Sequence, residues 1–567
     1  MGQAAPPAAG ASPWPGADTR RLWLVTLAAL VLFSYGLGVG TLWDQDEAKY
    51  TQVAVEILQT RDLFTLRVNG EPWFVHPPLF MWLQAGTGWL FGFTEFSARI
   101  WSAVSGAAVV AVTFLLGRFL YDSKTALVAC VILATTIQVF AQSRLAIFDP
   151  TLLAFMLSAF YMFLVAQASG SRKAHLWAWM WAGLATTTKG PIGLVLPVLV
   201  IGALAIVRRR WPRWREISLL GPVLFAAVGL HWYIIETVRH GAPFLRTVVG
   251  YYLFGRFFGV VENQPGPWWY YGPVLLAGAF PWTAFLPPAA VYHLRRRREF
   301  ASQVSLLWIG LTLVFYSAAG TKLPNYILPI YPLVAIAIGR LCVDALARDS
   351  ADAPRLLRWA FGFVLVGAAI FVAGIAIFGV VRFPAELAAL RTPLLIVTGV
   401  FAAGPLAAVF LFLTHRPALA VAALAATMVV ALPVLAHDTL PAIEAQRPIP
   451  RIARSLREQL RPPDGLAGVR MSETASLIYY TRHQVVWVET PADLARTLCR
   501  YDRLFLVVPE DEYRAWVASR LPATARQQGA DGRYRILLKE GATACAGART
   551  HRSAEPRAPA PQRRAWT

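Results

Sequence analysis

Three carboxylates and a lysine fall within six residues of the sequence, in the stretch WDQDEAKY that directly follows the apolar run Leu22–Leu42. Asp44 and Glu47 have the spacing of a D-x-x-E capping box, in which the first residue caps a helix and the second reaches back to the cap. Capping leaves Asp46 without a structural duty, and a carboxylate beside the membrane can act as a general base. We therefore take Asp46 as the candidate catalytic base. Its candidate supporting residues are Glu47, Lys49 and Tyr50.

The residues after this cluster follow a helical pattern. Apolar side chains recur at i, i+3, i+4, i+7 and i+8 from Tyr50 to Leu58, while polar side chains such as Gln52 and Glu56 take the other face. The pattern predicts an amphipathic helix at the membrane surface.

A second acidic candidate, Asp149, precedes Pro150 at the start of another apolar run. Asp followed by Pro is also a common way to begin a helix, so capping and a catalytic role both stay open here. Several cations stand at the ends of apolar runs, where long basic side chains commonly snorkel. Together they would suit an anionic ligand such as a lipid phosphate. These candidates are His76, Arg144, Lys189, Arg256 and Lys322, with Tyr326 in support.

The composition is that of a multi-pass membrane protein. Of 567 residues, 56% are hydrophobic and 15% charged, against roughly a quarter charged in soluble domains. Apolar runs of bilayer length recur from Leu22 to Ala436. The formal charge is +21, but the arginines gather in short clusters such as Arg208–Arg215 and Arg295–Arg298, as the positive-inside rule expects of cytoplasmic loops. We expect no nucleic-acid partner, because no basic domain with groove-reading chemistry accompanies the charge.

The order of the apolar runs and arginine clusters predicts the topology. With Arg20 and Arg21 in the cytoplasm and the short run Pro78–Phe93 lying in the interface, every later cluster falls inside after about 13 crossings. This parity predicts that Asp46, Asp149 and the candidate cations share the extracytoplasmic face.

Four regions are predicted along the chain. Residues 1–21 form a disordered cytoplasmic N-terminus, 22–436 the membrane domain, 437–546 an extracytoplasmic α/β domain and 547–567 a disordered basic tail. In the α/β domain, strand-like LIYYT, QVVWVE and RLFLVVP alternate with helix-like PADLARTLCR and EDEYRAWVASR. Cys499 and Cys545 belong to this domain, and an oxidising compartment permits a disulfide between them. Both the paired and the free state stay open.

We predict no metal and no other cofactor. Asp44 and Asp46 also form a D-x-D pair, which in other enzymes holds a divalent metal against nucleotide-sugar phosphates. No Rossmann-like pattern surrounds this pair, and nucleotide sugars are cytoplasmic whereas the segment is predicted to lie outside. No His/Cys/Glu cluster has the spacing of metal ligands.

A series of motifs, in this order, resembles the ArnT-like branch of the GT-C glycosyltransferases, relatives of the protein O-mannosyltransferases. The motifs are DQDEAKY, VNGEPWFVHPPLFMWL, EFSARIWSAVSG, SRLAIFDP, TTTKGPIG, GRF and GTKLPNYILPIYPLVAIAIG. The resemblance implies an all-α polytopic membrane fold of about 13 helices, juxtamembrane helices in the first outer loop and a small outer C-terminal α/β domain. In this family Asp46 looks like the catalytic aspartate and Asp149 like a second acidic residue, while Arg256 and Lys322 look like groups near the donor phosphate.

The resemblance also implies the reaction. Family members transfer a sugar from a polyprenyl phosphate to an acceptor at the extracytoplasmic side of the bacterial inner membrane, with inversion at the anomeric carbon. The acceptor class is a lipid A-like lipid, a glycan or a protein. This chain has Val75-His76-Pro77 where relatives carry an acidic-Lys-Pro run, and Tyr252-Leu253 where some carry Glu-His.

Two other functions stay open. A transporter or flippase of a lipid-linked sugar would also need membrane cations and carboxylates, although the predicted charges lie at one surface and not along the midplane. A membrane-anchored sensor or assembly factor would explain the C-terminal domain but not the charges of the outer loops.

Overall fold

The computed structural model describes residues 16–211, 220–260, 264–375, 391–439, 444, 447–471 and 474–542. The chain forms two compact units. The first holds the chain up to Gly38, Phe74–Phe80 and Arg99–Leu440, and the second holds Val39–Trp73, Met81–Ala98 and the chain from Pro441 onward. The segments between the first apolar run and Ala98 therefore pack largely with the C-terminal region. The predicted tail, residues 547–567, lies outside the described residues.

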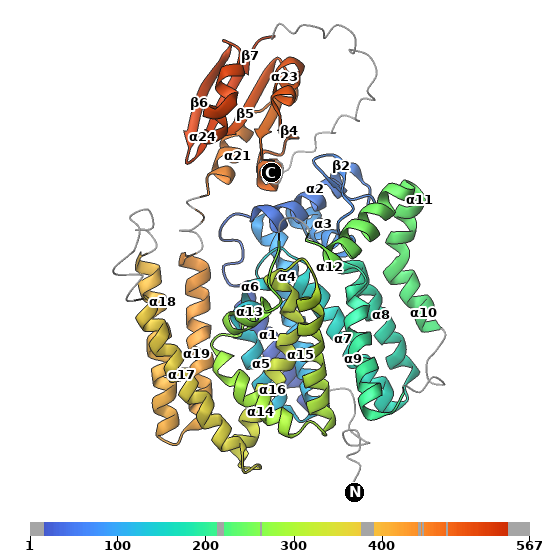
Figure 1. The fold of residues 1–567 in the computed structure, drawn as a ribbon, viewed down its shortest axis with the longest axis vertical. Helices are drawn as coiled ribbons and strands as arrows, with labels where there is room; N and C mark the ends of the chain where they lie inside the picture. Colours follow the sequence, from blue (N-terminus) through green and yellow to red (C-terminus); the bar gives the residue numbers. More distant parts are fainter. Residues whose placement is uncertain are drawn as a thin grey trace. The chain divides into compact units, whose positions relative to one another are not determined.

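The first unit is a bundle of apolar helices that run roughly along one direction (Figure 1). Its helices are α1 (Thr19–Ser34), α4 (Glu95–Leu120), α5 (Ser123–Ala134), α6 (Ile137–Gln142), α7 (Asp149–Ser169), α8 (Arg172–Lys189), α9 (Ile192–Arg208), α10 (Leu220–Phe225), α11 (His231–Leu245), α12 (Arg256–Phe258), α13 (Tyr271–Gly278), α14 (Leu286–Arg295), α15 (Phe300–Ala318), α16 (Tyr331–Ala347), α17 (Ala353–Ile375), α18 (Arg391–Leu413) and α19 (Pro417–Val434). Short π or 3-10 segments join some of them: η4 (Ala226–Leu230), η5 (Arg246–Gly255), η6 (Trp282–Phe285) and η7 (Pro324–Ile330).

Many helices of this unit have the length and apolarity of membrane spans. Within the described residues, eight helices could cross a membrane, or nine if the bent pair Tyr271–Gly278 and Trp282–Arg295 is one span. The apolar helices α5 and α9 are shorter. The predicted number of crossings therefore stays a prediction.

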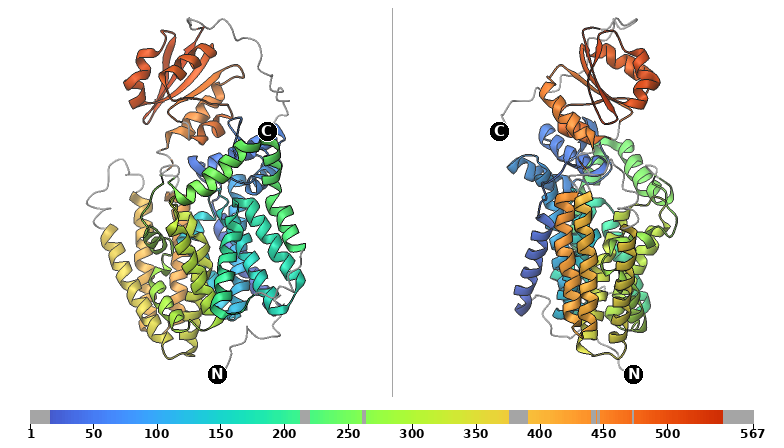
Figure 2. Two further views of the ribbon diagram at one scale, coloured as in Figure 1. Left: turned by 45° about the vertical axis from the view of Figure 1, so that its right-hand side comes forward. Right: turned by 90° about the vertical axis from the view of Figure 1, so that its left-hand side faces the viewer.

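The helices pack around one continuous apolar core. Large side chains such as Phe114, Phe160 and Trp308 are fully buried in it. Antiparallel α7 and α8 form one of the most extensive helix pairs, and α18 and α19 form another, which Figure 2 shows beside α17. Because α7 begins where α8 ends, residues at those two termini are brought to the same end of the bundle.

The second unit is a mixed α/β structure. Its helices are α2 (Lys49–Thr60), most of α3 (Leu79–Phe91), α21 (Pro448–Gln459), α22 (Ala475–Thr481), α23 (Pro491–Arg500) and α24 (Glu510–Glu512), with the π turn η2 (Asp44–Ala48) before α2. A small hairpin joins β1 (Arg67–Val68) to β2 (Glu71–Pro72). The larger sheet has the order β4-β3-β5-β7-β6 and consists of β3 (Gly465–Val469), β4 (Val486–Val488), β5 (Arg503–Pro509), β6 (Ala525–Asp531) and β7 (Tyr534–Glu540).

Most of the predicted elements in this region occur as expected, but the prediction of a strand at LIYYT is wrong. Strand β5 and helix α23 occupy the predicted segments Arg503–Pro509 and Pro491–Arg500. Leu477–Thr481 instead belongs to helix α22, which ends at Arg482 in the left-handed conformation. All seven residues of α22 are buried, so its sequence has no polar face whose spacing could distinguish a helix from a strand.

Helix α2 forms as predicted, but the middle of its polar face is buried. Gln52 and Glu56 are each 5% exposed, and Gln52 donates a hydrogen bond to Glu56 at 2.8 Å. The Glu56 carboxylate also accepts hydrogen bonds from the backbone N–H groups of Asn69 and Gly70, at 2.7 and 2.9 Å. The buried acid therefore holds the turn of the β1–β2 hairpin, a pairing between segments that the helical periodicity alone could not show.

The cysteines of the apolar helices differ from Cys499 in the C-terminal region. Cys130 and Cys342 are free and buried. Cys499 is disulfide-bonded, and its predicted partner Cys545 lies outside the described residues.

Candidate active site

Asp149 and Lys189 meet where the start of α7 lies beside the end of α8. The Lys189 ammonium donates to Asp149 Oδ1 at 2.6 Å, and the side-chain amide of Asn325 donates to Asp149 Oδ2 at 3.1 Å. Asp149 is only 5% exposed. A buried carboxylate needs such partners, because leaving it unpaired in a region of low dielectric is costly.

The alternative role of Asp149 as a helix cap is wrong. The residue at the cap position of α7 is Phe148, and no side chain caps this helix. Each carboxylate oxygen of Asp149 instead contacts a side chain from another element.

The end of α8 is fixed by a glycine. Gly190 follows Lys189 with φ +97°, and a Cβ there would lie 3.0 Å from the Tyr233 hydroxyl. A residue with a side chain would be strained at that φ. Gly190 thus ends the helix and lets the chain turn immediately after the lysine.

Arg256 is positioned by the backbone of the Gly320–Lys322 loop. The N–H groups of Gly320 and Thr321 donate to the carbonyls of Phe257 and Arg256, at 2.8 and 3.2 Å. A Cβ on Gly320 would lie 2.3 Å from the Gly259 carbonyl oxygen, so only glycine permits this approach. The contact joins the GRF and GTKLPNY motifs, and the Arg256 guanidinium donates to the Tyr326 hydroxyl at 3.1 Å.

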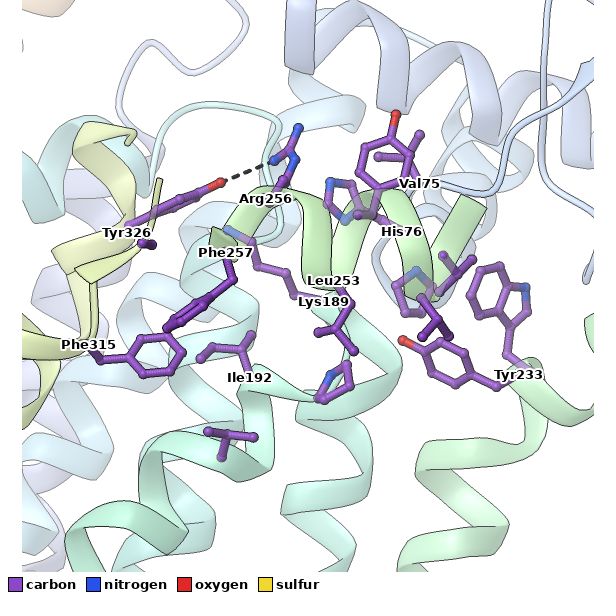
Figure 3. Close-up of a pocket in the computed structure, with 18 of the residues that line it drawn as sticks. Val75, His76, Lys189, Ile192, Tyr233, Leu253, Arg256, Phe257, Phe315 and Tyr326 are labelled. Atoms are coloured by element: carbon purple, nitrogen blue, oxygen red, sulfur yellow. Dashed lines mark hydrogen bonds between the residues drawn. The ribbon is translucent and has the colours of Figure 1, made fainter. Parts of the chain in front are cut away.

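A cavity of about 330 Å³ lies among these segments. Figure 3 shows that the polar ends of four residues from separate segments lie on one side of it: His76, Lys189, Arg256 and Tyr326. Apolar side chains line the rest, among them Ile192, Phe257 and Phe315. An apolar cavity with a few convergent polar groups has the usual character of a ligand site. Cations at the cavity wall favour an anionic ligand.

Aromatic rings hold the cations of this cavity in place. The Lys189 ammonium lies 5.0 Å from the ring centroids of both Phe148 and Tyr326. The Arg256 guanidinium lies 5.3 Å from the Tyr252 ring, and the His76 ring packs edge to face on Phe148 at 4.6 Å. The contacts of Lys189 and Arg256 are cation–π contacts, which attract a charge without neutralising it. The Lys189 charge is paired with Asp149 in addition.

Two of the predicted phosphate-binding cations do not line this cavity. The Arg144 guanidinium donates to the carbonyls of Phe33 and Tyr35, at 2.9 and 2.5 Å, where α1 ends. The Lys322 ammonium donates to the carbonyls of Ser317 and Ala319, at 2.9 and 2.5 Å, where α15 ends. Burial lowers the pKa of Lys322. Both cations lie where the negative end of a helix dipole favours them.

The predicted residues around Asp46 belong to the second unit. Asp46 is exposed and accepts a hydrogen bond from the Tyr50 hydroxyl at 2.9 Å. Glu47 is buried and accepts from the backbone N–H of Trp43 at 3.0 Å, while Lys49 is half-buried. Within this turn, Tyr50 contacts the Asp46 carboxylate and Glu47 contacts the backbone of Trp43.

The prediction that Asp44 caps the helix is wrong. The turn begins with Trp43 at the cap position, without a side-chain cap. Asp44 forms an ion pair with Arg447 at 3.0 Å and accepts from the backbone N–H of Ser476 at 2.9 Å. The carboxylate therefore ties the first loop to the C-terminal region of the same unit.

Across the described ranges, no group of three or more His, Cys, Asp or Glu side chains could hold a metal ion. The sequence had not singled out Asn325, although it stands beside Tyr326 in the GTKLPNY motif. Tyr252 and Phe148 were also missed, since aromatic residues are common in membrane helices and only their contacts distinguish them.

Comparison with known proteins places the chain in a family. A model of the family described as dolichyl-phosphate-mannose-protein mannosyltransferase matches residues 20–245. An undecaprenyl phosphate-alpha-4-amino-4-deoxy-L-arabinose arabinosyl transferase of Erwinia tasmaniensis is 30% identical over 376 residues, which are 65% of this chain and 67% of the relative. The chain belongs to the ArnT-like family of GT-C glycosyltransferases. A transferase of the same name from Pectobacterium carotovorum is 31% identical over 57% of this chain and 60% of its own.

The fold of this ArnT-like chain agrees with its family. The crystal structure of ArnT from Cupriavidus metallidurans bound to undecaprenyl phosphate superposes with a TM-score of 0.79 and 24% identity, covering 92% of this chain and 98% of that one. The expectations of a polytopic GT-C fold, a small C-terminal sheet region and a glycosyltransferase are confirmed.

Proposed function

We propose that this ArnT-like enzyme moves a sugar from a polyprenyl phosphate, such as undecaprenyl phosphate, to an extracytoplasmic acceptor. The observation that carries the proposal is the cavity of the first unit, where Lys189 and Arg256 stand beside apolar walls. A polyprenyl phosphate has the matching parts, an anionic phosphate and a long apolar chain. The curated relatives are named for a transfer from undecaprenyl phosphate.

The phosphate is the leaving group, and cations suffice to stabilise it. As the bond from the anomeric carbon to the phosphate oxygen breaks, negative charge grows on that oxygen, and fixed positive groups lower the barrier. Lys189 and Arg256 provide this charge, with His76 as a third donor when it is protonated. Tyr326 fixes the Arg256 guanidinium through its hydroxyl.

Asp149 and Asp46 take different parts in this mechanism. Asp149 is buried and accepts hydrogen bonds from Lys189 and Asn325. We therefore propose that Asp149 orients Lys189 and does not transfer a proton. Asp46 is exposed and can accept the proton of an acceptor hydroxyl as that oxygen attacks the anomeric carbon. Attack opposite the leaving phosphate inverts the anomeric centre.

No step in this scheme requires a metal. The acceptor is a lipid A-like lipid, a glycan or a protein with a free hydroxyl.

The orientation is part of the proposal. The positions of the arginine clusters in the sequence support an orientation with the polyprenyl phosphate cavity and the C-terminal region outside the cytoplasm of a bacterial inner membrane. Reporter fusions after Arg298 should report the cytoplasm, and fusions after Lys322 and Gly465 the outside. A cytoplasmic signal after Gly465 would contradict the count of about 13 crossings.

The function is tested with the purified full chain in lipid vesicles that contain a polyprenyl-phosphate sugar and an acceptor-bearing membrane extract. Release of polyprenyl phosphate is expected from a transferase, whereas movement of the intact lipid between leaflets without release would identify a transporter. Asp46→Asn should lower the rate about a hundredfold or more, the scale expected of a general base. The control Glu71→Gln changes an exposed acid of the same unit and should keep the normal rate. An active Asp46→Asn variant would exclude Asp46 as the base.

A further inference from the structure

A second cavity lies at the other end of α9. It has a volume of about 540 Å³, and its walls include Phe119, Phe163, Leu204, Arg208, Arg210 and Phe300. Helix α9 begins with Ile192, which lines the polyprenyl phosphate cavity, and ends with Arg208. At 1.5 Å per residue the two ends are about 24 Å apart, close to the thickness of a bilayer core. We call this second space the arginine cavity.

The backbone at the end of α9 directs basic side chains to this cavity. Arg209 adopts the left-handed conformation with φ 52°, and the Arg210 N–H donates to the Ala205 carbonyl at 3.0 Å. This closing pattern usually employs glycine. The turn brings Arg210 and Trp211 back to the cavity beside Arg208.

The charge of Arg208 is available to an anion. Its guanidinium donates to the Gln303 side-chain oxygen at 3.1 Å and lies 5.2 Å from the Phe300 ring centroid. Both of these partners are uncharged. Among the described residues that line the arginine cavity there is no carboxylate.

The cavity also has the marks of a membrane interface. Trp211 is 65% exposed, and exposed indole rings favour the level of the lipid headgroups. The remaining walls are mostly aromatic and aliphatic. Basic pockets between membrane helices bind anionic lipid headgroups, because the phosphate pairs with arginine while acyl chains cover apolar wall.

We propose that the arginine cavity binds an anionic phospholipid of the bilayer, with Arg208 and Arg210 on its phosphate and an acyl chain against Phe163 and Leu204. The site is separate from the reaction and does not rest on the proposed function. The bilayer itself supplies this ligand in excess, which favours a phospholipid over a scarce soluble phosphate.

The test measures thermal unfolding of the purified full chain in neutral detergent during titration with phosphatidylglycerol. Ligand binding to the folded state raises the unfolding midpoint. Phosphatidylglycerol should raise it, and phosphatidylcholine or inorganic phosphate should not. Arg208→Gln should increase the half-saturating lipid concentration about tenfold or more, the effect of one charge-assisted hydrogen bond. The matched control Arg298→Gln removes the same charge from an exposed arginine outside the cavity and should change the titration less than about twofold.

A second variant keeps the net charge and blocks the space. Ala168 is exposed at the cavity wall, so Ala168→Trp should fold and should abolish the lipid effect even if Arg208→Gln is unstable. If Arg208→Gln and Arg298→Gln weakened lipid binding equally, the lipid would be attracted by the diffuse surface charge, and the proposal would be overturned. An Arg208-dependent shift with inorganic phosphate, or with undecaprenyl phosphate but not phosphatidylglycerol, would also overturn it.

Discussion

Lys189 and Lys322 look alike in the sequence, since each follows an apolar helix at a membrane boundary, yet the structure gives them different partners. The Lys189 ammonium contacts a carboxylate and two aromatic rings and lines a cavity. The Lys322 ammonium contacts the carbonyls that α15 leaves without helical partners. A lysine among carbonyls completes a helix, whereas a lysine beside a cavity can meet a ligand. The contacts of Lys322 therefore stabilise the fold, whereas Lys189 is placed to contact a ligand in the cavity.

The largest effect is expected from removing the Lys189 cation of the cavity without leaving a buried charge. The double variant Asp149→Asn, Lys189→Met replaces a charged pair by a neutral one. Transfer should fall about a hundredfold or more, because the phosphate loses a fixed positive partner. The unfolding midpoint should change little, and the single variant Lys189→Met should be less stable than the double. A double variant with normal transfer would make this pair purely structural.

Lys322→Met should lower the stability of the protein and leave its transfer rate nearly unchanged, the opposite of the double variant. Its loss leaves carbonyls at the end of α15 without a partner, at a cost of about 1 to 3 kcal/mol in unfolding free energy. Transfer per folded molecule should stay within about threefold of normal, because the ammonium does not line the cavity. Thermal unfolding and single-turnover transfer measured on one preparation separate the two quantities. A large loss of transfer at normal stability would return Lys322 to the phosphate site.

A smaller effect is expected from Tyr326→Phe. The substitution keeps the ring beside Lys189 and removes only the hydroxyl that accepts from Arg256. One hydrogen bond of about 1 kcal/mol corresponds to roughly a fivefold lower rate. The paired variant Arg256→Gln should cost more, and its combination with Tyr326→Phe should cost less than the sum of the two. Full additivity would show that the tyrosine does not act through Arg256.

The smallest effect concerns a surface pair in the C-terminal sheet region. Hydrogen bonds from Arg535 lower the pKa of Glu510 to about 2. A carboxyl group whose pKa is lower in the folded state stabilises the fold at neutral pH and loses that contribution as pH falls from about 4.3 towards the folded value. Glu510→Gln should therefore be slightly less stable at pH 7 and lose less on acidification. Urea unfolding at pH 7 and at a pH below about 4.3 measures the difference. Equal losses of unfolding free energy in the variant and the unaltered protein would contradict the prediction.

The sequence predicted the site's cations but not their partners. Positions such as Lys189 and Arg256 could be recognised because charges at the ends of apolar runs are few and their motifs are ordered. The carbonyl contacts of Arg144 and Lys322 could not be foreseen, since every helix end offers free carbonyls and no residue type marks the one that is used.

The fold of the second unit shows the same limit. Helix α2 followed from its periodicity, but the burial of Glu56 depends on the hairpin turn at Asn69 and Gly70. Likewise, Asp44 matched a capping box by spacing, and its partner Arg447 lies 403 residues further along the chain. Local patterns specify local elements, whereas these pairings depend on tertiary contacts.

The long separation between Asp44 and Arg447 has a consequence for biosynthesis. The turn that carries Asp46 leaves the ribosome about 400 residues before Arg447 and Ser476, which hold it. At about 5 to 20 residues per second, this interval lasts roughly 20 to 80 s. During translation the turn that carries Asp46 therefore lacks the contacts of Asp44 with Arg447 and Ser476 until those residues have been made. Synthesis of about the last fifth of the polypeptide is what completes the loop that carries Asp46.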